Sequence, residues 1–145
     1  MANKQFRFAV PLMLLALGVS ACKSVPQPDQ VSTAGLRIDV LKLKNNSKRQ
    51  RLDVRTKIWN DHDQRITFKT ENVRMLCGGR EVAAKPSLTS DRSPDVGPHS
   101  NKEFGWVFET GEEMGEGSYE IEIRDIMLGD LPLGDTARYA VNVGR

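Results

Sequence analysis

The chain has 145 residues, with 21 Lys and Arg, 19 Asp and Glu, two cysteines and two histidines, which is enough for one small domain with one modest core. Its formal net charge of +2 disappears if the first 21 residues are removed, because that segment carries Lys4 and Arg7 and no acidic residue. Balanced charge gives no electrostatic basis for binding nucleic acid, which requires clustered positive residues.

The first predicted element is an apolar run near the N-terminus. Lys4 and Arg7 precede the segment FAVPLMLLALGV, whose length is typical of the apolar core of a secretory signal. The run is too short for a membrane-spanning helix, which needs about 20 apolar residues, and Pro11 interrupts it. We therefore expect residues 1–21 to be a signal peptide that is removed.

The segment VSAC at the end of this run closes at Cys22 and resembles the lipobox of bacterial lipoproteins. The resemblance implies that the Cys22 thiol carries a diacylglyceryl group, that cleavage makes Cys22 the first mature residue, and that its amino group is acylated. Several acyl chains hold a protein at a membrane durably, whereas one chain holds it only marginally. The alternative is an ordinary secretory signal that leaves Cys22 as a free or disulfide-forming thiol.

The residue after the lipobox cysteine bears on location. In the lipoprotein class, an aspartate at this position typically retains the protein at the inner membrane, and this chain has Lys23 there. The resemblance therefore implies an outer-membrane protein of a two-membrane bacterium, facing either the periplasm or the cell surface.

Residues 22–35 are predicted to be a flexible, lipid-anchored tether. After Cys22 they read KSVPQPDQVSTAG, and so few large apolar side chains cannot bury enough surface to offset the entropy of ordering. The remaining residues, 36–145, are predicted to form a single folded domain.

That domain shows the alternation of apolar and polar residues typical of half-buried strands. The clearest runs are RLDVRTKIW, SYEIEIRDI and ARYAVNV, and further candidates are LRIDVLKLK, RITFKT, VRMLC, EVAAK and EFGWVFET. In LRIDVLKLK the apolar phase slips between Val40 and Leu41, which indicates a bulge. Turn-forming segments such as NNS, NDHDQ, GGR and GEEMGEG separate the runs. Seven to eight short strands predict an all-β, antiparallel sandwich.

The stretch RLDVRTKIWNDHDQRITFKTENVRMLCGGRE is also similar to the central hairpins of immunoglobulin-like domains in bacterial envelope lipoproteins. The matching parts are WNDHDQ, ITF and VRMLCGG. The resemblance implies an immunoglobulin-like sandwich for residues 36–145. It says little about function, because many such domains are uncharacterised and one fold serves many functions. The disulfide between the sheets of antibody domains cannot form, since this domain contains Cys77 alone.

Cys77 shares one face of the VRMLC run with Val73 and Met75. This position predicts a small, buried apolar residue with an inert thiol. If Cys22 is lipidated, it cannot form a disulfide within the chain. If it is not lipidated, a disulfide between Cys22 and Cys77 is the alternative.

Weak candidates for a metal site are Asp61, His62 and Asp63 in NDHDQ. Adjacent residues seldom point at one ion, and good sites need several ligands with supporting hydrogen bonds. Asn and Asp are frequent in solvated turns, so the segment is interpreted as a turn, and no metal or cofactor is predicted.

Two residues are candidate partner contacts. Trp59 follows Ile58 directly and so lies on the opposite face of its strand, where an exposed indole can anchor a partner; the alternative is that it caps the end of the sandwich. His99 lies in SLTSDRSPDVGPHSN, which is long for a loop, and such loops are often functional or disordered.

The sequence supports a catalytic function less well than a binding function. Glu112, Glu113 and Glu116 lie in a Gly-rich segment, which predicts a wet turn rather than carboxylates with separated pKa values. No phosphate cradle, nucleophile elbow or Cys–His pair stands out. We therefore expect a non-catalytic, lipid-anchored envelope protein that binds another envelope protein or a cell-wall component. The alternative is a periplasmic module that binds a small ligand or a metal.

Overall fold

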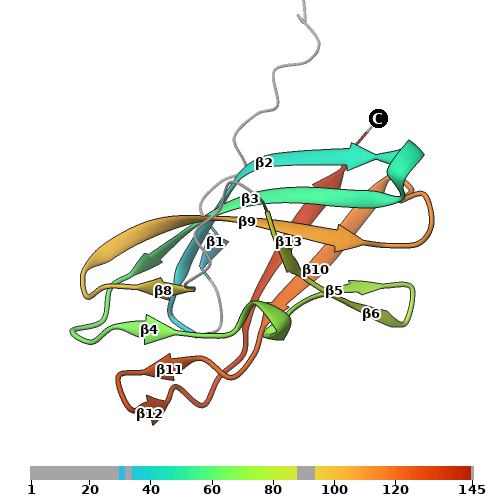
Figure 1. Ribbon diagram of the computed structural model, residues 1–145. Helices are drawn as coiled ribbons and strands as arrows, with labels where there is room; N and C mark the ends of the chain where they lie inside the picture. The colour runs from blue at the N-terminus through green and yellow to red at the C-terminus, as the bar shows by residue number, and fades with distance from the viewer. Residues whose placement is uncertain (1–29, 32–33, 88–93, 145) are drawn as a thin grey trace, which may run out of the picture.

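The structure is a computed structural model (Figure 1) and describes residues 30–31, 34–87 and 94–144. These residues contain thirteen strands in three sheets, and every strand pair is antiparallel. Two one-turn 3-10 helices, η1 (Ser47–Arg49) and η2 (Thr70–Asn72), connect strands. The all-β prediction is confirmed. The predicted signal peptide, Cys22 and most of the predicted tether lie outside the described residues.

Sheet A has the strand order β1-β2-β3-β9-β7. Its strands are β1 (Gln30–Val31), β2 (Arg37–Asn46), β3 (Arg51–Asn60), β9 (Ser100–Glu109) and β7 (Lys85–Pro86). β3 has the predicted alternation, since its buried side chains include Leu52, Val54, Thr56 and Ile58. The pairing of β2 with β3 shifts register between Val40 and Lys42, so the predicted bulge is confirmed.

Sheet C has the order β13-β10-β5-β6, and Figure 1 shows β13 and β10 running obliquely to the strands of sheet A. Its strands are β13 (Ala137–Val143), β10 (Gly117–Ile123), β5 (Val73–Cys77) and β6 (Arg80–Ala83). All four coincide with predicted runs to within a few residues. The EVAAK run is divided between β6 of this sheet and β7 of sheet A, because Ala84 is buried between them and donates its amide to the carbonyl of Val73.

Sheet B, with the order β12-β11-β4-β8, consists of two-residue strands and differs from the sequence prediction. The strands are β12 (Leu131–Pro132), β11 (Met127–Leu128), β4 (Ile66–Thr67) and β8 (Asp95–Val96). The predicted RITFKT strand is therefore only β4, and the chain turns into η2 after it. The segment predicted as one long loop at 87–101 contains β8, which pairs with β4. Strands this short leave no readable alternation in a sequence.

The core contains side chains from all three sheets. Phe104, Trp106 and Phe108 are buried on one face of β9, which coincides with the predicted EFGWVFET run. The rings of Phe104 and Trp106 stack with their centroids 5.3 Å apart, and Phe68 meets Phe104 edge-on at 5.6 Å. Within the described ranges, no helix is long and apolar enough to cross a membrane.

Candidate functional site

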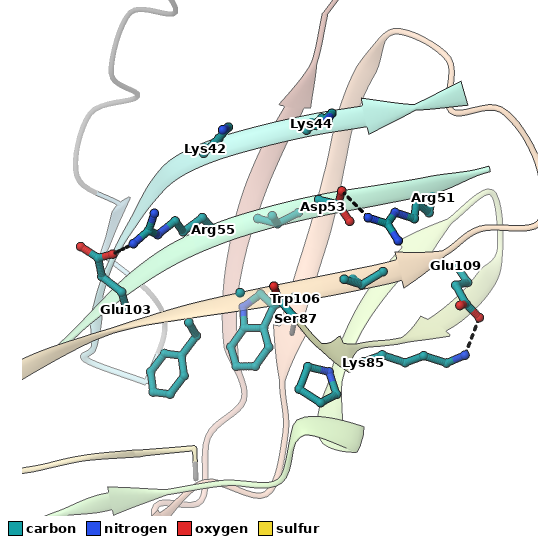
Figure 2. A pocket seen from close by; sticks show the side chains of 15 residues that line it. Lys42, Lys44, Arg51, Asp53, Arg55, Lys85, Ser87, Glu103, Trp106 and Glu109 are labelled. Atoms are coloured by element: carbon teal, nitrogen blue, oxygen red, sulfur yellow. Dashed lines mark hydrogen bonds and ion pairs between the residues drawn. The ribbon is translucent and has the colours of Figure 1, made fainter. Parts of the chain in front are cut away.

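The outer face of sheet A carries a groove of about 670 Å³ (Figure 2), lined by residues of β2, β3, β7 and β9. The outward positions follow from the alternation, because burial of the even-numbered residues of β3 turns Arg51, Asp53 and Arg55 outward. The register places Gly105 opposite Arg55 and Val107 opposite Asp53. Gly105, which has no side chain, and Val107, which has a short apolar one, thus form the floor of the groove.

Ion pairs hold the long side chains toward the ends of this groove. Arg55 contacts Glu103 at 2.6 Å, and Lys85 pairs with Glu109 at the other end. Figure 2 shows these two pairs on opposite sides of the groove. Gly105 and Val107 lie between Glu103 and Glu109 along β9. The ion-paired groups are largely exposed, so their contribution to stability is small. Their structural effect is to keep these long side chains away from the middle of the groove.

Two lysines at the β2 side of the groove remain unpaired. Lys42 and Lys44 are exposed, and neither makes a hydrogen bond or ion pair with another residue in the described part of the chain. Lys42 lies directly opposite Arg55 in the β2–β3 register, which places like charges side by side, an unfavourable pairing. The groove is lined by five cationic side chains and three carboxylates, so its rim carries excess positive charge.

Sequence reasoning missed this groove. The outward positions of LRIDVLKLK do include Lys42 and Lys44, and that basic face was a signal. Its neighbours, however, come from β9 and β7, which are more than forty residues away along the chain. Only the strand order reveals that Gly105 and Val107 of β9 lie between the lysines of β2 and Lys85 of β7.

The turn residues singled out in the sequence meet at one end of the domain. Nε2 of His99 lies 2.6 Å from Oδ1 of Asp63, and the His99 amide donates to the His62 carbonyl at 3.3 Å. His99 also has a positive φ of 47°, which the tight turn between β8 and β9 requires. The structure thus brings Asp63 and His99 together. Their role in partner binding stays a prediction.

Asn60 organises this end of the domain, and sequence reasoning did not single it out. Its fully buried side chain donates through Nδ2 to the carbonyls of Gln64, Val96 and Gly97, at 2.8 to 3.1 Å. Its Oδ1 accepts from the His62 amide at 3.0 Å. This is the Asx-type turn chemistry expected of NDHDQ. The described residues contain no group of three or more His, Cys, Asp and Glu side chains that could hold a metal ion, and the Asp61–Asp63 segment forms none.

Trp59 lies on the outer face of sheet A, opposite to Ile58, as the alternation predicts. The Arg37 guanidinium lies 4.2 Å and the Lys57 ammonium 4.7 Å from its ring centroid. Its Nε1 donates to Asp39 Oδ2 at 2.9 Å. A partner that used Trp59 would have to displace cations that are attracted to the ring, so its contact role stays a prediction.

Cys77 is buried, with 3% of its surface exposed, and its Sγ lies 3.8 Å from Sδ of Met114. Burial raises the pKa of the Cys77 thiol, partly offset by nearby Arg80. The predicted burial is confirmed, and a raised pKa keeps the thiol in its unreactive form. Glu112 is exposed and pairs with Arg80 at 2.7 Å.

These observations define the structural class of the protein, which is an antiparallel all-β domain with a charged groove on its five-stranded sheet. Neither the protein-family models nor the curated proteins compared with the chain match it. Among solved structures, it is similar to ycdA, described as a candidate lipoprotein of Bacillus subtilis subsp. subtilis str. 168, with a TM-score of 0.55 and 9% sequence identity. The similarity covers 83% of this chain and 39% of that chain. At this identity it concerns the fold alone.

Proposed function

We propose that this chain is a lipid-anchored cell-envelope protein whose β-domain is a non-catalytic binding or adaptor module. Its partner is another envelope protein or a cell-wall component. The observation that carries the binding role is the groove on the outer face of sheet A, which is floored by Gly105 and Val107. At its β2 side, Lys42 and Lys44 have no ion-pair partner among the described residues. Positive charge without an internal partner at a concave surface favours recognition of a negatively charged group.

The sequence around Cys22 supports the anchor. VSAC follows an apolar run that is too short to span a bilayer, and acylation at Cys22 would hold the domain at the membrane. The solved protein with a similar fold is itself described as a candidate lipoprotein. Lys23 after the cysteine favours the outer membrane.

The arrangement of the longer strands supports an immunoglobulin-like sandwich as the finer description of the fold. Seven described strands have four or more residues, three of them in sheet A and four in sheet C. Immunoglobulin-like domains of the seven-strand type divide their strands between two sheets in the same numbers. The loops of such domains, and the exposed faces of their sheets, are available for binding.

The proposal is tested by crosslinking in intact cells, followed by affinity capture of the tagged protein and mass spectrometry. A Cys22→Ala variant is the control. We expect an envelope protein or wall fragment to be captured reproducibly with the wild-type chain and lost with the variant. Recovery of no partner from a protein shown to be lipidated and folded would contradict the adaptor role.

The anchor is tested separately by the mass of the mature N-terminal peptide and by fractionation of the two membranes. We expect an acylated Cys22 in the outer-membrane fraction. An unmodified Cys22, or a Cys22–Cys77 disulfide in the intact protein, would contradict lipid anchoring.

A further inference from the structure

We propose that the groove on the outer face of sheet A binds an extended segment of a partner protein that carries two acidic residues, two positions apart, facing Lys42 and Lys44. This inference rests on the proposed binding function and names the chemistry of the partner. It is argued from the spacing of the lysines, the signs of the surrounding charges and the shape of the floor.

The spacing of the two lysines matches an extended peptide. Lys42 and Lys44 are alternate residues of a regular stretch of β2, paired in order with Arg55 and Asp53. Alternate residues on one face of a strand are about 6.6 to 6.8 Å apart. An extended segment lying along the sheet repeats the same distance between its own alternate side chains. Acidic residues at positions i and i+2 therefore face both lysines at once.

The signs of the charges favour a protein segment over a polyanion. Asp53, Glu103 and Glu109 line the same groove as the lysines, and they would repel a chain that is negative at every unit, such as a polyphosphate. A peptide can place its acids at Lys42 and Lys44 and uncharged residues near Glu103 and Glu109. Asp53 lies opposite Lys44, but its charge is balanced by Arg51 at 3.1 Å. Discrimination of this kind comes from unfavourable pairings as much as from favourable ones.

The charges around Lys42 favour a specific position for an acidic residue of the bound segment. Arg55 lies opposite Lys42 and is held toward Glu103 at 2.6 Å. A carboxylate beside Lys42 would relieve the repulsion between Lys42 and Arg55 that the sheet register imposes. The low floor at Val107 leaves room for the backbone of the bound segment along β9.

The first experiment measures binding of fluorescent, capped peptides to the full chain in detergent by anisotropy. The probe is Thr-Asp-Thr-Asp-Thr, and the spacing control is Thr-Asp-Asp-Thr-Thr, which has the same composition but places its acids on opposite faces. We expect the alternating peptide to bind more tightly and its binding to weaken with added salt. Equal binding of the two peptides would overturn the proposal.

Variants locate the binding surface. Lys42→Glu/Lys44→Glu is expected to weaken binding of the alternating peptide about tenfold or more, because two attractive pairs are lost and the reversed charges add repulsion. Lys42→Gln/Lys44→Gln should give a smaller loss. Lys48→Glu/Arg49→Glu, an equal charge change at the exposed η1, should leave binding unchanged. A similar loss in both charge-reversal variants would show non-specific attraction and overturn the site.

Two further probes test the other sources of negative charge. Inorganic polyphosphate and phosphatidylglycerol vesicles are expected to bind wild type more weakly than the alternating peptide does. Tighter binding of either probe than of the peptide, through these lysines, would overturn the assignment to a protein segment. Capture of a partner in cells that is insensitive to Lys42→Glu/Lys44→Glu would refute this inference while leaving the proposed binding function standing.

Discussion

The hydroxyl of Tyr139 in sheet C lies 3.3 Å from Oγ1 of Thr56 in sheet A, and this buried hydrogen bond joins the two sheets across the core. Both residues face inward by simple alternation in their own strands. Each hydroxyl gives the other a hydrogen-bond partner, and a buried hydroxyl without a partner would destabilise the fold.

Replacing Tyr139 with Phe should therefore destabilise the domain by about 1 to 2 kcal/mol, because the Thr56 hydroxyl loses its partner. Thr56→Val should cost a similar amount, and the double variant should cost less than the sum of the two. Urea unfolding of the four proteins measures this coupling. Strictly additive effects would show that the two hydroxyls do not stabilise each other.

The same tyrosine predicts a loss of stability at alkaline pH. Burial raises the pKa of Tyr139 from 10.0 to about 12, although its hydrogen bond to Thr56 acts in the opposite direction. The unfolded chain loses the phenolic proton near pH 10 and the folded chain only near pH 12. Stability is therefore fully present below pH 10 and declines between pH 10 and pH 12, by on the order of 2 to 3 kcal/mol.

Unfolding free energies of wild type and Tyr139→Phe across this pH range measure the effect. The variant should lack the decline that Tyr139 causes, whereas Tyr119→Phe should keep it, because Tyr119 is only half-buried and bonds to the Gly115 carbonyl at an exposed site. Identical pH profiles for wild type and Tyr139→Phe would refute the prediction.

Asn60 should be the most sensitive residue of the turn at 60–64. Asn60→Ala removes the side chain that serves the carbonyls of Gln64, Val96 and Gly97. We expect a loss of about 2 to 4 kcal/mol, because one buried and two partly buried carbonyls lose their partner together. Thermal unfolding measures it, with Asp61→Ala as an exposed control that should change stability by less than about 0.5 kcal/mol. Equal effects of the two substitutions would contradict the role of Asn60.

Glu122 should stabilise sheet C through two arginines. Its side chain is 6% exposed and accepts from Arg124 Nη2 at 2.6 Å and from Arg138 Nε at 3.2 Å. Glu122→Gln keeps the shape but removes the charge, so we expect a loss of about 2 to 3 kcal/mol in denaturant unfolding. Glu120→Gln, two residues away and exposed, is the matched control. A negligible loss in Glu122→Gln would show that solvent replaces the carboxylate.

Much of the fold could be predicted because long strands leave a periodic record. The alternation identified β3, β5, β10 and β13, and the slip at Val40 identified the bulge in β2. The burial of Cys77 and Trp106 followed from the same period. Sheet B could not be predicted, since two residues per strand give no period and its four strands come from segments more than sixty residues apart at the extremes.

The candidate site was predictable only in part. Asp63 and His99 were both singled out, but their contact depends on β4 and β8 pairing beside β3 and β9. Asn60 was read simply as a turn residue, because the carbonyls that it serves lie at 64, 96 and 97.

By itself, the sequence determined the longer strands and the inward or outward direction of their side chains, because these depend on neighbours within a few residues. It also fixed the features that predict export and lipidation at Cys22, because that signal is read as a linear motif. Only the tertiary structure decided that Lys42 and Lys44 border a groove floored by Gly105 and Val107. The physical reason is strand order: β2, β3, β9 and β7 are neighbours in sheet A but not in the chain.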